Sequence, residues 1–228
     1  MEFVNERIHR IPQSELSILE HRLSLSATTD VRSSYGIRKV HCLYFDRAYE
    51  STAFETRNNL IQKNEYRISY EGQDLSTLRL GKKCAANGMS RTESCEISRE
   101  LVEMILYGTY SDIVRDCQGR TGEDLDPLLQ EFYWEVIGRG LRPKVLVDYE
   151  TKSFAYSQGN AQVTINHDAG VSYHIRDFLD PWHKTTAIRN NQAVVHVKWD
   201  HFLPDVVRTA FLMVGMNGHS YHSLYQVM

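Results

Sequence analysis

The sequence lacks any long apolar run. No stretch of its 228 residues approaches the roughly 20 apolar residues that a bilayer-spanning helix requires. The first residues also contain no basic segment leading into an apolar run, so no secretory signal is expected. The four cysteines show no C-x-x-C spacing, which favours reduced thiols (Cys42, Cys84, Cys95 and Cys117). We therefore expect a soluble, cytoplasmic protein that does not itself insert into a membrane.

An excess of positive charge is also missing. Lys and Arg number 26 against 29 Asp and Glu, for a net charge of −3. Because proteins that coat nucleic acid are usually basic, no nucleic-acid partner is expected. A basic lining inside an acidic shell stays compatible with this balance, since net charge does not describe how charges are arranged. The chain also lacks internal repeats, low-complexity tracts and long linkers, so we expect one domain over residues 1–228.

What is present is a mixture of helical and strand patterns. Helices are predicted from Pro12 to about Leu25 and over residues 98–106, 126–137 and 204–216, with a short helix or turn at 49–56. Strands are predicted over residues 40–45, 66–70, 77–83, 145–149, 162–166 and 194–199, with turns at 71–74 and 87–88. Helices at the start, middle and end around many antiparallel strands indicate an α+β fold. A meander or closed barrel would satisfy so many strand edges.

The strands separate polar from apolar side chains. Successive side chains of a strand point to opposite faces, so Val195 and Val197 share one face while His196 and Lys198 share the other. In the same way Val163 and Ile165 lie opposite Gln162, Thr164 and Asn166, while Arg67 shares a face with Ser69, and Arg79 with Gly81 and Lys83. These polar faces fit either a solvated outer sheet face or a barrel interior that binds a charged ligand. Composition and periodicity leave both alternatives open.

Six segments in order resemble the bacterial VTC (vacuolar transporter chaperone) polyphosphate polymerase family. They are L-Y-F-D at 43–46, K-N-E-Y-R-I-S-Y at 63–70, L-R-L-G-K-K at 78–83 with N-G-M at 87–89, R-P-K-V-L-V-D-Y at 142–149 with Phe154, V-T-I at 163–165, and V-K at 197–198 with F-L-P at 202–204. The resemblance extends over nearly the whole chain. It favours the closed barrel over the solvated sheet.

The resemblance implies a triphosphate tunnel, which is an antiparallel β-barrel decorated by helices. It also implies transfer of the γ-phosphoryl group of a nucleoside triphosphate to polyphosphate, with Mn²⁺ or Mg²⁺ offsetting the developing charge. By this resemblance Arg67 and Lys198 would be catalytic, and Glu6 and His196 would hold the metal. Phosphate contacts would come from Lys63, Lys82, Lys83 and Arg91.

The chain departs from the family pattern at many charged positions. His41, Thr151 and Gln162 stand where the family has arginine, and so does Ser69. Glu65 replaces a lysine. Gly81 and His196 replace glutamates, of which the second binds metal in the family, and Mg²⁺ prefers oxygen ligands to imidazole. Since loss of one preorganised donor lowers a rate by on the order of 100- to 1,000-fold, an impaired polymerase is expected.

Two further functions stay open. A non-catalytic relative, or pseudoenzyme, would bind polyphosphate, another polyanion or a partner protein, and some bacterial relatives sit beside membrane proteins. Triphosphatases and class-IV-type cyclases of the same superfamily carry E-x-E-x-K near the N-terminus, and residues 6–10 match only the first position, Glu6. Product formation from nucleoside triphosphate would distinguish an enzyme from a binding protein.

Overall fold

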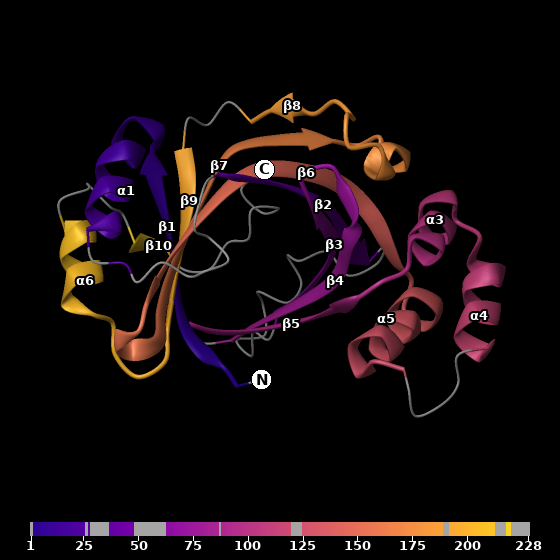
Figure 1. Ribbon diagram of the computed structural model, residues 1–228. Helices are drawn as coiled ribbons and strands as arrows, with labels where there is room; N and C mark the ends of the chain where they lie inside the picture. Colours follow the sequence, from indigo (N-terminus) through magenta and orange to yellow (C-terminus); the bar gives the residue numbers. More distant parts are fainter. Residues whose placement is uncertain are drawn as a thin grey trace.

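The computed structural model describes residues 2–25, 27, 37–47, 63–86, 88–119, 125–188, 192–212 and 218–219 (Figure 1). Within these residues, eight antiparallel strands form a closed ring in the order β1-β5-β4-β3-β2-β6-β7-β9, and β9 returns to pair with β1. Their bounds are β1 Val4–Pro12, β2 Arg38–Arg47, β3 Lys63–Glu71, β4 Asp74–Ala86, β5 Met89–Glu96, β6 Leu141–Tyr156, β7 Ala161–Ser172 and β9 Gln192–Trp199. The short strands β8 (Thr186–Ala187) and β10 (Gly218–His219) pair with β7 and β1 outside this ring. The predicted barrel is therefore confirmed.

Helices cover two sides of the barrel (Figure 1). On one side lie α3 (Arg99–Tyr107), α4 (Tyr110–Gly119) and α5 (Pro127–Gly138); on the other lie α1 (Leu16–Ser24), which follows the 3₁₀ turn η1 (Gln13–Glu15), and α6 (Asp205–Leu212). Local sequence fixes their ends: the side chain of Ser98 accepts the backbone N–H of Leu101 at the start of α3, and Asp126 accepts that of Leu128 before α5. None of the described helices combines the length and apolar character needed to cross a bilayer.

Each helical layer packs on outward-facing side chains of the barrel. One apolar cluster joins α3, α4 and α5 to the outer faces of β2, β3 and β4, with Phe132 and Ile68 at its centre. A second joins α1 and α6 to β1, β7 and β9 through Leu19, Val163 and Val195. Because the apolar alternate residues face the helices, the polar alternate residues are left facing the interior.

Most predicted elements are present, but the predicted strands do not include β1 or the short β8 and β10, and there are three further differences. β6 extends to 16 residues although the predicted strand covered five, because the charged positions Glu150 and Lys152 interrupt its apolar alternation. β5 was not predicted, since most of its residues are polar and only alternate ones meet the core. α4 was also missed, as its sequence has few apolar residues. The predicted segment 49–56 and the end of the last predicted helix, 213–216, lie outside the described residues.

Candidate functional site

The barrel encloses a polar cavity of about 640 Å³, here called the barrel cavity. Alternate residues of the strands line it, including the predicted polar faces of β7 and β9. Its charged and polar lining residues include Glu6, Arg67, Ser69, Arg79, Lys83, Thr92, Thr151, Gln162, Thr164, Asn166, His196 and Lys198. An apolar cluster with Ile8, Tyr44 and Val147 occupies another part of the interior. The polar faces of β7 and β9 therefore line the interior of the barrel.

Three cations of the barrel cavity have no ion-pair partner among the described residues: Arg67 of β3, Arg79 of β4 and Lys198 of β9. Arg67 donates to the hydroxyl of Tyr44 at 3.5 Å, and its side chain lies across Gly81, where a Cβ atom would be 3.6 Å from Arg67 Cγ. Arg79 donates to the backbone carbonyl and the hydroxyl of Ser94. Arg79 is exposed and lies opposite Glu96, whereas Arg67 and Lys198 are partly buried positive charges without an ion-pair partner among the described residues, which favours an anionic ligand.

Inside the barrel, the carboxylate of Glu6 contacts the side chains of both Lys83 and His196. Its Oε1 atom accepts from Lys83 Nζ at 2.8 Å and lies 3.0 Å from His196 Nδ1. Burial alone would raise the pKa of the Glu6 carboxyl, but the hydrogen bond of His196 and the charge of Lys83 hold this pKa well below its usual range. Burial also lowers the pKa of His196, so the imidazole is neutral and donates through Nδ1 to the carboxylate.

Lys198 lies between two cavities. It lines the barrel cavity and, together with Thr92, a second cavity of about 570 Å³ beside the start of β1. Its Nζ atom donates to Thr92 Oγ1 at 3.2 Å. Because the ammonium is buried, its pKa is lowered from the usual lysine value. An anion that enters the barrel would therefore stabilise the charged form of Lys198.

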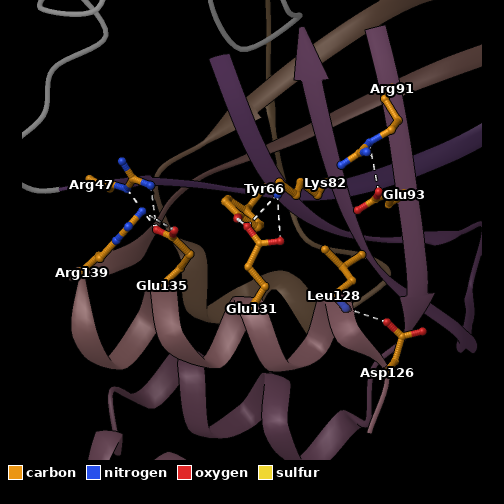
Figure 2. Close-up of polar contacts among 10 residues, drawn as sticks. All are labelled: Arg47, Tyr66, Lys82, Arg91, Glu93, Asp126, Leu128, Glu131, Glu135 and Arg139. Carbon is orange, nitrogen blue, oxygen red and sulfur yellow. Dashed lines mark hydrogen bonds and ion pairs between the residues drawn. The ribbon is translucent and has the colours of Figure 1, made fainter. Parts of the chain in front are cut away.

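Two of the predicted phosphate-binding residues lie on the outer face of the barrel wall (Figure 2). Lys82 Nζ contacts Glu131 of α5 at 2.6 Å, and the hydroxyl of Tyr66 donates to the same carboxylate at 2.6 Å. Arg91 pairs with Glu93 at 3.0 Å and lies over the Phe3 ring, where it lines the second cavity. Neither joins Arg67 and Lys83 in the barrel cavity. Lys63 begins β3, and its side chain lies outside the described residues.

The residues around Glu6 fit a divalent cation in part. Glu6 Oε2 is buried and has no hydrogen-bond partner among the described residues, and His196 lies beside the same carboxylate. One carboxylate oxygen is the kind of ligand that Mg²⁺ or Mn²⁺ takes from a protein when phosphates and waters supply the rest. The imidazole of His196 suits Mn²⁺ better than Mg²⁺. Glu6 would therefore hold the cation, with His196 positioning the carboxylate.

Three features of the site were not predicted from the sequence. Thr92 contributes from β5, a strand that was not predicted. Arg79 lines the barrel cavity but was not among the predicted site residues. The strand alternation could have identified it, because Arg79 lies on the same face of β4 as Thr77 and Lys83. Arg38 and Glu71 form an ion pair of 2.8 Å at the rim, which a linear sequence does not reveal.

The sequence profile of the VTC domain matches residues 5–227 of the chain. The chain belongs to the VTC domain family. No curated protein matches it. Among solved structures, this VTC domain is similar to a candidate adenylate cyclase from Bacillus halodurans, with 10% identity, a TM-score of 0.45, and coverage of 93% of this chain and 88% of that one. It is also similar to a chain of the Schizosaccharomyces pombe Mediator head module, with 7% identity, a TM-score of 0.47, and coverage of 94% and 98%. At such identities and scores, neither likeness bears on function.

Proposed function

We propose that this VTC domain binds a linear phosphate anion in the barrel cavity and transfers the γ-phosphoryl group of a nucleoside triphosphate to polyphosphate at a reduced rate. The observation that carries the proposal is the set of three cations, Arg67, Arg79 and Lys198, without an ion-pair partner among the described residues of a closed barrel. A polyanion that neutralises Arg67 and Lys198 would recover the free energy lost on burying these two charges, and exposed Arg79 would add attraction for it. Membership of the VTC domain family supports the same ligand class.

Each residue would act by position and charge. Arg67 and Lys198, on opposite sides of the barrel, would hold successive phosphates in line, and Arg79 would contact the part of the chain nearer the β3–β4 turn. Phosphoryl transfer needs little proton transfer from the protein, so no general base is required of His196. A divalent cation held by Glu6 would supply charge stabilisation at the phosphoryl oxygens. The reduced rate follows from Lys83, which is already paired with Glu6.

The test is incubation of the purified protein with ATP and Mn²⁺, followed by polyphosphate staining on a gel. We expect slow accumulation of chains that grow with time. In parallel, polyphosphate without ATP should raise the melting temperature, because a ligand that binds only the folded state stabilises it. Absence of both product and stabilisation would contradict the proposal entirely.

Glu6→Gln separates binding from transfer in the same assay. This variant removes a negative charge beside Lys83 and keeps the shape of the side chain. Metal-free polyphosphate affinity should rise by up to about tenfold, the equivalent of about 1.4 kcal/mol. Product formation should fall by on the order of 100-fold, the usual effect of losing one preorganised group. Loss of both binding and product would instead indicate that Glu6 maintains the fold.

A non-catalytic polyphosphate-binding protein is the second candidate function. The Lys83–Glu6 ion pair favours this alternative, because Glu6 neutralises the charge of Lys83. Fewer positive charges are then left to stabilise the transition state of phosphoryl transfer. Stabilisation by polyphosphate without any product from ATP and Mn²⁺ would establish this alternative.

Polyphosphate affinity should weaken in alkaline solution because of Lys198. Its lowered pKa means that the free protein loses this charge at a lower pH than a solvent-exposed lysine, whose pKa is about 10.4. Arginine stays charged over this whole range, so Lys198→Arg should keep its affinity to higher pH than the wild type. Anisotropy of labelled polyphosphate from about pH 7 to about pH 10.5 would measure both profiles. Identical alkaline profiles would show that Lys198 does not contact the anion.

A further inference from the structure

A buried cluster of two histidines and one aspartate lies on the outer wall of the barrel, away from the barrel cavity. His41 of β2 and Asp148 of β6 are neighbours across the β2–β6 pair, and their side chains point opposite to the interior residues Cys42 and Tyr149. His183 closes the cluster from the segment between β7 and β8, which includes the 3₁₀ helix η4 (Ile175–Leu179) and runs outside the barrel (Figure 1). The side chains are 2%, 6% and 1% exposed for His41, Asp148 and His183.

The three donor atoms converge. Asp148 Oδ1 lies 2.9 Å from His41 Nδ1 and 3.1 Å from His183 Nε2, and all three ligand atoms lie within 4.8 Å of one another. Ligands of a tetrahedral zinc ion, with bonds of about 2.0–2.1 Å, are about 3.3 Å apart. The two distances to Asp148 Oδ1 therefore need only a small expansion to surround a metal ion, and the two histidine nitrogens lie within 4.8 Å of each other. The other Asp148 oxygen, Oδ2, is buried and has no hydrogen-bond partner among the described residues.

The far side of the His183 ring is held by the backbone. His183 Nδ1 lies 2.7 Å from the backbone carbonyl of Asp180, which can only accept, so Nδ1 must carry a proton. Burial would lower the pKa of His183, but its hydrogen bonds to Asp148 and to the Asp180 carbonyl raise it, so without a metal ion Nε2 is protonated and donates to Asp148. A metal ion would take the place of that proton. The carbonyl of Asp180 is then the outer partner that metal-bound histidines usually have.

We propose that His41, Asp148 and His183 form a binding site for Zn²⁺ or a similar first-row transition metal, which fastens the segment between β7 and β8 to the barrel wall. Two imidazoles and one carboxylate suit such ions better than Mg²⁺ or Ca²⁺, which prefer oxygen ligands. Three protein ligands leave one coordination position for water or hydroxide. Nearby contacts hold the same segment: Tyr70 donates to the carbonyl of Phe178 at 3.0 Å, and the rings of His41 and His183 meet edge-on with centroids 5.1 Å apart.

The test measures the metal directly. Protein treated with EDTA is supplied with Zn²⁺, passed through a desalting column and analysed by mass spectrometry of its metals. We expect about one zinc ion per chain and a higher melting temperature than for the stripped protein. Titration with Co²⁺ should give the visible absorption of a tetrahedral site. His183→Ala should weaken zinc affinity by at least about 100-fold, because loss of an outer partner alone weakens it by 10- to 100-fold.

Controls distinguish this site from two others in the chain. Asp168→Asn alters the half-exposed cluster of Glu150, His167 and Asp168, and His196→Ala alters the barrel cavity; both should keep the zinc ion. Asp148→Asn should lose it, and His183→Gln serves as a second variant, with far-UV circular dichroism to verify folding. Zinc retained by both His183 variants, lost in His196→Ala, or never bound by the wild type would overturn the proposal. In the last case the cluster would be a hydrogen-bonded ion pair with a protonated His183.

Discussion

Arg67→Ala and Lys198→Ala are each expected to weaken polyphosphate binding and to lower phosphoryl transfer by on the order of 100-fold or more. The two side chains come from β3 and β9, which are not adjacent in the barrel, so they approach a bound anion from different sides. Neither has an ion-pair partner among the described residues, so truncation leaves no buried acid unpaired. The loss should therefore fall on the ligand and not on the fold.

Lys82→Ala is the matched control for these variants. Lys82 precedes Lys83 on β4 but points outward to Glu131, so its removal deletes the same charge from the chain without changing the barrel cavity (Figure 2). Anisotropy of labelled polyphosphate, the ATP assay and thermal melting should be measured for all three variants. Wild-type affinity in Arg67→Ala, or an equal loss in Lys82→Ala, would show that the anion does not bind inside the barrel.

The fold could be predicted because the alternation of polar and apolar residues shows which face of each strand is packed against helices. On β9, Val195 and Val197 meet helices α1 and α6 while His196 and Lys198 face the cavity, as the alternation predicted. The family resemblance then indicated that these polar faces line the interior of a closed barrel. Strand β5 escaped prediction because its inward face carries small polar residues such as Thr92, which are also typical of loops.

The site could be predicted only in part, because charge alone does not tell on which side of the wall a residue lies. Lys82 and Lys83 are adjacent and chemically alike, yet one binds helix α5 and the other binds Glu6 inside the barrel. The partner that decides this, Glu131, lies 49 residues away from Lys82. The cluster of His41, Asp148 and His183 was missed for the same reason: it joins three distant segments.

Gly159→Ala is expected to lower the free energy of unfolding by about 2–5 kcal/mol. Gly159 lies in the turn between β6 and β7 with φ of +66°, a conformation that costs an L-residue about 1–2 kcal/mol. A Cβ atom there would also overlap the backbone carbonyl oxygen of Phe202, which cannot move like a flexible side chain. Steric overlap of this kind adds about 1–3 kcal/mol.

Gly72→Ala separates the two contributions. Gly72 has a similar φ of +58° in the β3–β4 turn, but a Cβ atom there meets nothing within 4 Å. It should therefore lose only about 1–2 kcal/mol. Equilibrium unfolding in urea measures both variants, and equal losses would show that the contact with Phe202 relaxes freely.

The Gly159 variant should also affect the barrel cavity. The carbonyl of Gly159 accepts the backbone N–H of Asp200 at 3.1 Å, two residues beyond Lys198 on the same strand end. Relief of the overlap must move the Phe202 backbone away from the turn, and Lys198 lies close enough along the chain to shift with it. Polyphosphate affinity should therefore fall in Gly159→Ala even at temperatures where the protein stays folded, whereas Gly72→Ala should bind as the wild type does. An unchanged affinity in both would show that the end of β9 holds Lys198 independently of this turn.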